Sequence, residues 1–410
     1  MEITLKSAIF ALAVVGVGLA FVNFFLVSSV SDKNHSVLSG NESKGLPLFA
    51  NTKMYFSYLD IDSHAEYKIQ PNFISGTDTA FHREDDVVLV THCTVNHLHY
   101  LLDIVEHWQG PISVAVVVPG LHIVSAYKSM IGLHLCNKDV QQRVTFHVVY
   151  PLSHPALDNR LSNYVRLARA ELPLTCEEFM VTLQTGLANS ANYGGEVPYP
   201  SNVLRNVGRE HSKAKFVFVV DIDMMCNGNL YKDFLNFSRE NNLFSMTVKQ
   251  VYVVPAFESQ ENLPPNTNKM ELIKMWENGK VLPFYYQACR KCQSPTNYDK
   301  WKRSRSSSGL HVSFTRSWTD PWEPFYISLN SVPLYDGRFK QYGFNRISQV
   351  CETHVAGFSF AVLDNAFLVH HGFKQRFHKK KDAENNKNRE LFRKFKKELK
   401  SKYPDSKNSC

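Results

Sequence analysis

Two acidic residues, Asp221 and Asp223, flank Ile222 directly after the strongly apolar run of residues 216–220. Side chains of an extended chain alternate with a period of two, so both carboxylates point the same way. Two such carboxylates repel each other unless a cation joins them, and their hard oxygen atoms favour Mg²⁺ or Mn²⁺. A diphosphate would complete the coordination shell. The spacing therefore indicates a metal–nucleotide site, with a strand-end turn carrying solvated acids as the alternative.

The same triplet occurs earlier in the chain, at Asp60-Ile-Asp62, and provides an internal comparison. No long apolar run precedes it, so no buried strand would deliver these carboxylates to the edge of a sheet, and we expect a surface turn. Another candidate lies near the end of the chain, where His370 and His371 follow the apolar residues 367–369. A lone histidine is usually structural, but two at a strand end are better candidate metal ligands.

Short apolar runs alternate with stretches of helical periodicity, and together they predict an α/β domain. Runs that are apolar on both faces favour a mostly parallel central sheet covered by helices on both sides. Ligands of such sheets bind at the carboxyl ends of the strands, which directs attention to Thr91 and to the Asp221–Asp223 turn. The expected strands are residues 87–91, 112–118, 144–149 and 216–220, and the expected helices are residues 98–108, 121–135 and 201–211.

The N-terminal segment has the properties of a membrane anchor. Residues 8–28 are almost unbroken in their apolar character, and about 20 residues at 1.5 Å rise span the roughly 30 Å of a bilayer core. A cleaved signal peptide is the alternative, because a small-residue exit follows the apolar run. We expect a cytosolic N-terminus at 1–7, a transmembrane signal-anchor at 8–28, a stem and N-terminal extension at 29–84, a catalytic domain at 85–403 and a C-terminal tail at 404–410.

The net charge of +8 belongs to the C-terminal segment, because residues 374–410 carry 14 Lys and Arg against 5 Asp and Glu. The rest of the chain is almost neutral, which argues against a nucleic-acid enzyme, whose positive charge would cover its working face. Leu391, Phe395, Leu399 and Tyr403 recur every four residues, so we expect a helix docked by one apolar face. Cys289 and Cys292 have half the spacing of a zinc site, but no second pair follows, which favours a disulfide or free thiols.

Five stretches resemble the LARGE-type glycosyltransferases of family 49. The resemblance covers about residues 86–403 and is strongest in its last two stretches. The stretches are YPSNVLRN at 199–206, VDIDM at 220–224, DPWEPFY at 320–326, YDGRFKQYGFNRISQ at 335–349 and FLVH at 367–370.

This resemblance implies a Rossmann-like GT-A nucleotide-sugar domain in a single-pass type II protein of the Golgi membrane. It further implies Mn²⁺ and a UDP-glucuronate donor. Asp221, Asp223 and His370 would be the metal ligands, with His371 as the alternative to His370. The reaction implied is an inverting β-1,4 transfer of glucuronate to a xylose-terminated glycan, a step of O-mannosyl glycan synthesis on dystroglycan-like glycoproteins.

An inverting transferase needs a base for the acceptor hydroxyl, and Glu323 and Asp336 are the candidate catalytic residues. Glu323 could instead cap a turn between two prolines, and Asp336 could cap a helix expected over residues 338–352. For the donor, Arg205 and Arg346 are candidate partners of the glucuronate carboxylate, since a carboxylate pairs best with a guanidinium. Asn206 and Thr91 complete the candidate donor-binding set, and a surface salt bridge is the alternative for each arginine.

Two other functions remain open at the level of sequence. One is a related Golgi transferase that uses a different UDP-sugar, with xylose or N-acetylglucosamine. The other is a catalytically silent, membrane-anchored glycan-binding protein, against which the intact pair Asp221 and Asp223 argues. We expect no nucleic-acid partner, and a homodimer and a complex with other Golgi transferases both stay open.

Overall fold

The computed structural model describes residues 59–78, 83–157, 160–185, 197–304, 309–374 and 382–410. These described residues form one compact unit. The predicted anchor at 8–28 and the predicted stem as far as residue 58 lie outside the described residues. Within the described ranges, no helix is both long enough and apolar enough to cross a membrane.

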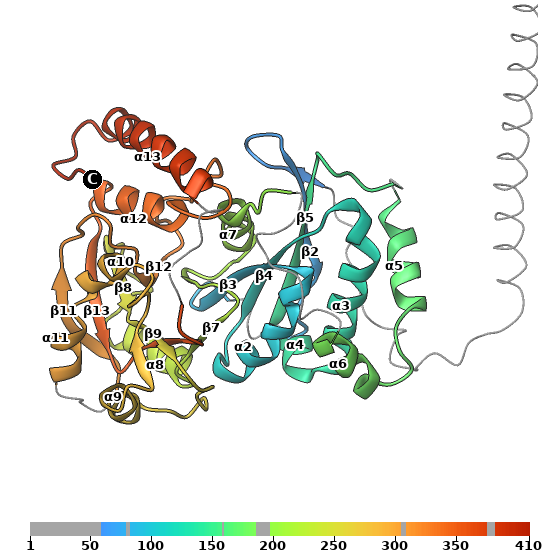
Figure 1. Ribbon diagram of the computed structural model, residues 1–410, viewed down its shortest axis with the longest axis horizontal. Coiled ribbons are helices and arrows are strands. Elements are labelled where there is room, and N and C mark those ends of the chain that lie inside the picture. The colour runs from blue at the N-terminus through green and yellow to red at the C-terminus, as the bar shows by residue number, and fades with distance from the viewer. Residues whose placement is uncertain (1–58, 79–82, 158–159, 186–196, 305–308, 375–381) are drawn as a thin grey trace, which may run out of the picture. The chain divides into compact units, whose positions relative to one another are not determined.

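A large mixed sheet forms the centre of the unit (Figure 1). Its ten strands lie in the order β1-β2-β5-β4-β3-β6-β12-β8-β13-β11. The two strands β1 and β2 come from the predicted N-terminal extension, and β2 pairs with β5, so this extension contributes to the sheet. The strands are β1 (Asp60–Ile61), β2 (Tyr67–Ile74), β3 (Val87–Thr94), β4 (Ile112–Val117), β5 (Val144–Pro151), β6 (Phe216–Val219), β8 (Gln250–Val254), β11 (His311–Arg316), β12 (Phe325–Leu329) and β13 (Ser359–Asp364).

The expectation of a mostly parallel sheet is wrong for half of it. The strands β5, β4, β3 and β6 are parallel to one another, as expected. In contrast, β12 runs antiparallel to both β6 and β8, and β11 runs antiparallel to β13. A run that is apolar on both faces indicates an interior strand, but its direction depends on the connection that precedes it, which the run itself does not encode.

Helices cover both faces of the parallel half. One face carries α2, α3, α4 and their neighbours, and the other face carries α7, whose Val203, Leu204 and Val207 pack against β2, β4 and β5. The predicted helices at 121–135 and 201–211 are confirmed within one or two residues. The helix predicted at 98–108 starts three residues earlier, at Val95, and its first part is a 3-10 helix. The elements of this half are η3 (Val95–Tyr100), α2 (Leu101–His107), η4 (Gly120–His122), α3 (Ile123–Cys136), α4 (Lys138–Arg143), α5 (Leu161–Ala170), α6 (Cys176–Thr185) and α7 (Ser201–Glu210).

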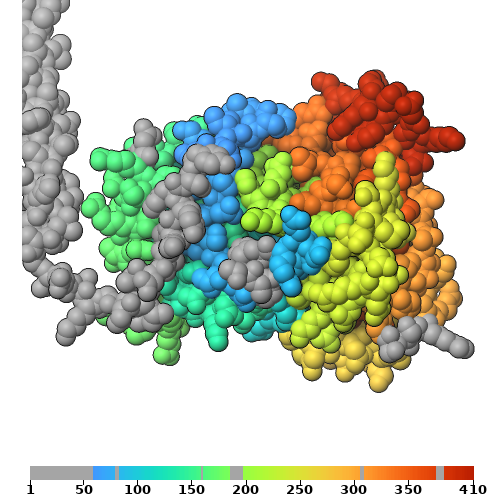
Figure 2. Space-filling model, turned by 180° about the vertical axis from the view of Figure 1, so that it is seen from behind, coloured from blue at the N-terminus to red at the C-terminus, as the bar shows by residue number. Residues whose placement is uncertain are grey.

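A second sheet of four strands lies beside the first, in the order β10-β9-β14-β7. The elements of this half are β7 (Met224–Cys226), α8 (Leu230–Glu240), β9 (Ala256–Ser259), α9 (Lys269–Glu277), β10 (Val281–Pro283), α10 (Arg290–Gln293), η5 (Ser294–Thr296), α11 (Tyr298–Arg303), α12 (Asn345–Val355), β14 (Leu368–His371) and α13 (Asp382–Lys402). The α13 helix docks as predicted, because Phe395 and Leu399 are buried in the core of this half, and Phe392 joins them. Figure 2 shows α13, in red, lying over the orange segments of this half.

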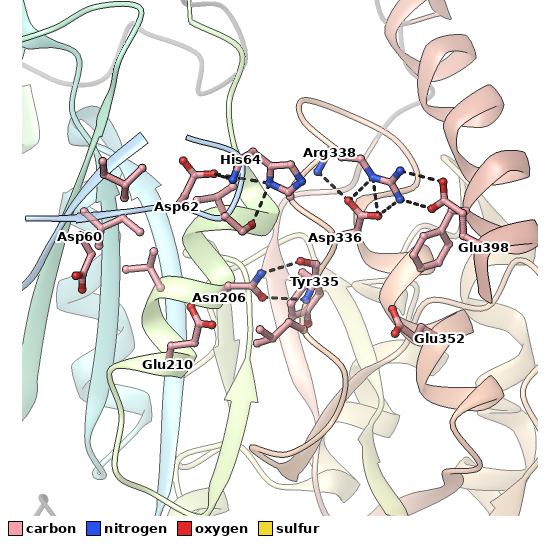
Figure 3. A pocket seen from close by; sticks show the side chains of 18 of the residues that line it. Asp60, Asp62, His64, Asn206, Glu210, Tyr335, Asp336, Arg338, Glu352 and Glu398 are labelled. Atoms are coloured by element: carbon pink, nitrogen blue, oxygen red, sulfur yellow. Dashed lines mark hydrogen bonds and ion pairs between the residues drawn. The ribbon is translucent and has the colours of Figure 1, made fainter. Parts of the chain in front are cut away.

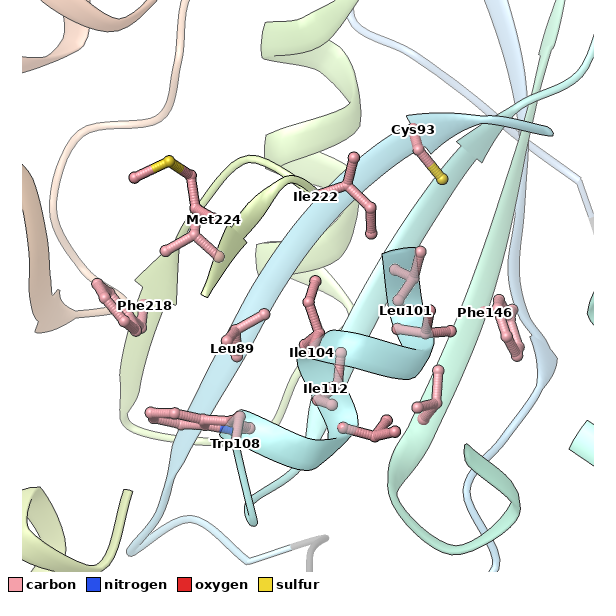
Figure 4. Packing of buried hydrophobic residues seen from close by; sticks show 14 of the residues in the cluster. Leu89, Cys93, Leu101, Ile104, Trp108, Ile112, Phe146, Phe218, Ile222 and Met224 are labelled. Atoms are coloured by element: carbon pink, nitrogen blue, oxygen red, sulfur yellow. The ribbon is translucent and has the colours of Figure 1, made fainter. Parts of the chain in front are cut away.

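The Asp221–Asp223 turn is anchored in the hydrophobic core by the residues that alternate with the carboxylates. Ile222 and Met224 are both buried, and they pack in the cluster that contains Leu89 and Ile104 (Figure 4). Residues 221–224 form a turn closed by a hydrogen bond from the N–H of Met224 to the carbonyl of Asp221 at 3.0 Å, and both carboxylates stay partly exposed at the carboxyl end of β6. The core therefore fixes the position of the turn that the sequence singled out.

Three disulfides are present, and they join Cys136 to Cys176, Cys289 to Cys292 and Cys351 to Cys410. The pair at 289 and 292 is thus a disulfide, as the sequence favoured over half a zinc site. The last bond ties the predicted C-terminal tail to α12. Cys93 and Cys226 are buried free thiols in the described part of the chain.

Candidate active site

Asp221 is held by two guanidinium groups from distant elements. Arg205 of α7 donates from Nη2 to Oδ1 at 3.0 Å, and Arg346 of α12 donates from Nη2 to Oδ2 at 2.7 Å. Burial alone would raise the pKa of Asp221, but the positive charges of Arg346 and Arg205 outweigh it and hold the pKa well below its usual range. The Asp221 carboxylate is therefore ionised at every physiological pH.

A buried histidine lies behind the same carboxylate. His92 of β3 places Nε2 3.7 Å from Asp221 Oδ1, and its Nδ1 lies 2.6 Å from the hydroxyl of Tyr199. Burial, with the nearby charge of Arg205, lowers the pKa of His92 to about 3, so the ring is neutral. Sequence reasoning missed His92, although it directly follows Thr91 at the strand end that was singled out.

Asp223 has a different set of partners, which the smaller sheet brings to it. Pairing of β14 with β7 sets His370 opposite Met224, and His370 Nε2 lies 3.2 Å from Asp223 Oδ2. Lys374 donates from Nζ to the same oxygen at 3.1 Å. Burial alone would raise the pKa of Asp223, but Lys374 and His370 lower it by more than burial raises it. This carboxylate is therefore ionised as well.

The register also separates the two adjacent histidines. His370 points toward Asp223 and is largely buried, whereas His371 is exposed. Alternation along β14 sends their side chains to opposite faces of the sheet, so only one can reach the carboxylate. Lys374 was missed, since nothing in the sequence relates a lysine three residues beyond the strand to Asp223.

The donor atoms around Asp223 fit a divalent cation in part. His370 Nδ1 lies 2.8 Å from the carbonyl oxygen of Gly372, which can only accept, so Nδ1 carries the hydrogen. In the neutral ring Nε2 then presents a lone pair toward a carboxylate, and a cation or a second proton must bridge them. However, the described residues contain no group of three or more His, Cys, Asp or Glu side chains arranged to hold a metal ion. In the structure, the two carboxylate oxygens of Asp221 instead accept hydrogen bonds from Arg205 and Arg346.

A cavity of about 320 Å³ opens beside Asp221, and Glu323 lies in its wall. Arg205 and Arg346 line it too, as do the disulfide loop at 288–293 and Arg389 of α13. Burial raises the pKa of Glu323 to about 7, with Arg346 opposing the rise. A carboxylate with a pKa near neutrality can take up and release a proton under working conditions. The geometry therefore gathers Asp221, Glu323 and the two predicted arginines in one place.

Asp336, the other candidate base, lies in a different cavity of about 900 Å³ (Figure 3). Its carboxylate accepts hydrogen bonds from Nε and Nη2 of Arg338, whose guanidinium also pairs with Glu398. The predicted helix at 338–352 with Asp336 as its cap is wrong. The helix α12 begins at Asn345, because Gln341, Gly343 and Phe344 adopt positive φ angles that interrupt a helix.

Asn206 and Thr91 do not line the cavity beside Asp221. The amide group of Asn206 donates to the carbonyl of Tyr335 at 2.7 Å and accepts from its N–H at 2.9 Å, which fixes that loop (Figure 3). Thr91 is buried in β3, and its Oγ1 has no hydrogen-bond partner in the part of the chain that the structure describes. The structure thus assigns Asn206 a loop-holding contact and leaves Thr91 inside the sheet.

The chain matches one family model, described as glycosyl-transferase for dystroglycan, over residues 86–404. The chain belongs to this glycosyltransferase family. All the candidate site residues, from Thr91 to His370, lie inside the matched range, and so does Lys374.

Curated relatives agree with the family. The chain is 41% identical over 366 residues to β-1,4-glucuronyltransferase 1 of Danio rerio, which covers 85% of this chain and 83% of the relative. It is 39% identical over 361 residues to the human protein of that name, with the same coverage. A match to the human xylosyl- and glucuronyltransferase LARGE1 is 26% identical and covers 70% of this chain but 31% of LARGE1.

Two solved structures to which the chain is similar are distant likenesses. S. aureus TarS superimposes with a TM-score of 0.36 at 10% identity, over 79% of this chain and 40% of TarS. GalNAc-T7 with UDP, GalNAc and Mn²⁺ has a TM-score of 0.33 at 10% identity, over 78% of this chain and 51% of that one.

Proposed function

We propose that this glycosyltransferase moves glucuronate from UDP-glucuronate to a hydroxyl of a xylose-terminated glycan, forming a β-1,4 linkage with inversion. The name of the two relatives at 41% and 39% identity, β-1,4-glucuronyltransferase 1, supports this donor and linkage. The family description supports an acceptor on dystroglycan. The proposal includes a GT-A-type nucleotide-sugar domain, supported by a cavity at the carboxyl end of the parallel strand β6.

The observation that carries the proposal is the meeting of Glu323 and Asp221 in one cavity. In a single displacement the acceptor hydroxyl loses its proton as it attacks the anomeric carbon, and the base must be ionised beforehand. Glu323 meets this requirement, since burial raises its pKa only to about 7. Asp336 is less suited, because its carboxylate is held by Arg338 in the other cavity.

Arg205 and Arg346 are proposed to orient the donor. Each guanidinium presents several N–H groups in one plane, and a single contact with Asp221 leaves others for the glucuronate carboxylate or the diphosphate. The Arg346 guanidinium also stacks on Phe325, with 3.9 Å between its central carbon and the ring centroid. Stacking fixes the plane of the guanidinium, which favours directional recognition of a planar anion.

Mn²⁺ is the proposed cofactor, with Asp223 and His370 as its holders and Asp221 as the third ligand. When bound, a divalent cation would neutralise the charge that builds on the leaving diphosphate. Lys374 places a positive charge on Asp223 in the structure. The ammonium group of Lys374 must therefore move aside, or share Asp223, when a cation binds.

Location and partners follow the same proposal. Residues 8–28 would anchor the chain in the Golgi membrane as a single-pass type II protein, with the catalytic unit in the lumen. Under this topology Asn236, which is exposed on α8 in an Asn-Phe-Ser triplet, would be open to glycosylation.

A donor screen tests the proposal. The full chain would be incubated with a β-xyloside acceptor and, in turn, UDP-glucuronate, UDP-xylose or UDP-N-acetylglucosamine, with and without Mn²⁺. We expect transfer from UDP-glucuronate, and we expect it to depend on the metal. Preference for UDP-xylose would instead support the second candidate, a transferase of different donor specificity, which the similarity to LARGE1 favours. Absence of transfer from all three donors would contradict both.

A further inference from the structure

Part of the lining of the cavity beside Asp221 is a short loop that the disulfide between Cys289 and Cys292 closes on itself. We propose that this loop is a positioning element for the Glu323 carboxylate. The inference rests on the proposed function, since it concerns the residue assigned there as the base. Neither cysteine is proposed to react; the loop acts through its contacts with Glu323.

Two hydrogen bonds join the loop to the backbone of Glu323, one to its N–H group and one to its carbonyl group. The N–H of Glu323 donates to the carbonyl of Cys292 at 3.0 Å. The side-chain amide of Gln293 donates from Nε2 to the carbonyl of Glu323 at 2.9 Å. Gln293 is buried, so its amide does not exchange this partner for water. Both polar groups of the Glu323 backbone are therefore held by two consecutive residues of the loop.

The disulfide has a local role rather than a global one. It joins residues only 3 apart, whereas the bond between Cys136 and Cys176 joins residues 40 apart. A cross-link stabilises the folded state more as the loop it closes grows, so the short one contributes little to overall stability. The helix α10 has only four residues and would be marginal without support. The cross-link therefore holds the carbonyl of Cys292 in the position where it accepts the hydrogen bond from the N–H of Glu323.

The loop is itself tied to the sheet that carries His370. The N–H of Cys289 donates to the carbonyl of Tyr285 at 2.9 Å. The N–H of Tyr285 donates to Oε1 of Glu258 at 2.8 Å. The other oxygen of Glu258 accepts from the N–H of Lys374 at 3.1 Å. Glu258 is fully buried on β9, so a single carboxylate connects the loop beside Glu323 with the segment beside Asp223.

The residues just before Glu323 are held in place by contacts of their own. Trp322 is fully buried and donates from Nε1 to the hydroxyl of Thr296 at 3.0 Å. Trp318 donates from Nε1 to the carbonyl of Trp322 at 2.7 Å. Trp322 and strand β12 hold the chain before and after Glu323, and the two contacts with the loop hold the backbone of Glu323 itself, from which its side chain extends.

A double-mutant cycle tests the inference. Cys289→Ser/Cys292→Ser would be compared with Glu323→Gln and with the combination of the two in the full chain, with UDP-glucuronate and a β-xyloside. We expect the cysteine variant to lower kcat by about 10- to 100-fold, because a displacement of about 1 Å is enough for such a loss. The donor KM should change less than about twofold. In the Glu323→Gln background the cysteine change should have almost no further effect, since the group it positions is gone.

The matched control is Cys136→Ser/Cys176→Ser, which removes a disulfide between α3 and α6, away from the cavity. It should lower Tm more than the test variant does and leave kcat unchanged. Should the test variant fail to fold by circular dichroism, Gln293→Met keeps the disulfide and removes one of the two contacts, and it should also lower kcat.

Three results would contradict the inference. Unchanged kcat in Cys289→Ser/Cys292→Ser and in Gln293→Met would show that the loop does not position Glu323. If the cysteine variant lowered kcat by the same factor in the Glu323→Gln background as in the unaltered enzyme, the loop would have a general structural role. Full activity of Glu323→Gln alone would refute the assignment of the base, and with it this inference, so the two failures are distinguishable.

Discussion

The chain contains the triplet Asp-Ile-Asp twice, and the two copies do different things. At the first copy, Asp62 accepts hydrogen bonds from the backbone N–H groups of His64, Glu66 and Tyr67 at 3.0, 2.7 and 2.6 Å. These partners lie within five residues, so this carboxylate organises its own turn. At the second copy, Asp221 and Asp223 are held by side chains that lie between 16 and 151 residues away.

The comparison shows that the elements around a triplet, and not its letters, decide its chemistry. The second copy follows β6, a buried interior strand, so it emerges at the edge of a sheet where other elements converge. The first copy begins in β1, a two-residue strand at the border of the sheet. It lines the larger cavity beside α7 and Arg338, but the backbone groups that bind Asp62 belong to its own turn. Four predictions test this difference, from the largest expected effect to the smallest.

Replacement of Asp223 should have the largest effect. Asp223→Asn removes the charge that Lys374 and His370 face and takes away a proposed metal ligand. We expect transfer to fall by about 10³-fold or more, a loss comparable to removing a central electrostatic group from an active site. The rate of product formation from UDP-glucuronate measures it. Asp60→Asn is the matched control in the first triplet and should keep activity within about twofold; equal losses in both would contradict the distinction.

Glu323→Gln should have the next largest effect, a fall in kcat of about 10²-fold, in the range for removal of a general base. The pH dependence gives a second measurement. The base works only when ionised, and burial raises the pKa of Glu323 to about 7, so kcat of the unaltered enzyme should rise as pH increases through about 7. The Glu323→Gln variant should lose this rise. A pH profile that stays the same in the variant would assign the ionisation to another group.

Arg346→Lys should have an intermediate effect, of about tenfold on donor KM. Lysine keeps the charge beside Asp221 but loses the planar set of N–H groups and the stacking on Phe325. The control is Arg338→Lys, which changes an equally paired arginine in the other cavity. If both variants bind the donor as the unaltered enzyme does, Arg346 does not orient the donor.

Asp62→Asn should have the smallest effect, and on stability alone. His64 donates to one oxygen of Asp62, and Glu66 and Tyr67 donate to the other. Asparagine keeps only one of these two acceptors, so we expect a loss of about 1 kcal/mol in the free energy of unfolding. Denaturant titration measures it, and transfer activity should be unchanged. A loss of activity at constant stability would place the first triplet in the working part of the enzyme.

The sequence predicted the two carboxylates and their place at the end of a strand, because an apolar run that stops at acidic residues has few other solutions. It also predicted the docked C-terminal helix, whose residues Phe395 and Leu399 are buried as their spacing required. Arg205 and Arg346 were predicted to bind the UDP-glucuronate donor, and they do line the cavity. Both also donate hydrogen bonds to Asp221. The roles proposed for these residues stay predictions until the variants are measured.

Other features had no local signal. The start of α12 at Asn345 depends on positive φ angles at Gln341 and Phe344, which the residue types alone did not indicate. The separation of Glu323 from Asp336 into two cavities depends on how the loops on either side of β12 return to the sheet. The roles of Lys374 and Glu258 depend on the pairing of β14 with β9, which joins segments more than 100 residues apart.

By itself, the sequence determined which segments are apolar, and hence the strands, the helices and the acidic turn that ends β6, because period and burial are properties of neighbouring residues. Only the tertiary structure decided which charges meet those acids, because the register of β14 on β7 selects His370 over His371 and the packing of α7 and α12 brings in two guanidiniums. Interactions between charges depend on distance in space, which the order of residues along the chain does not fix.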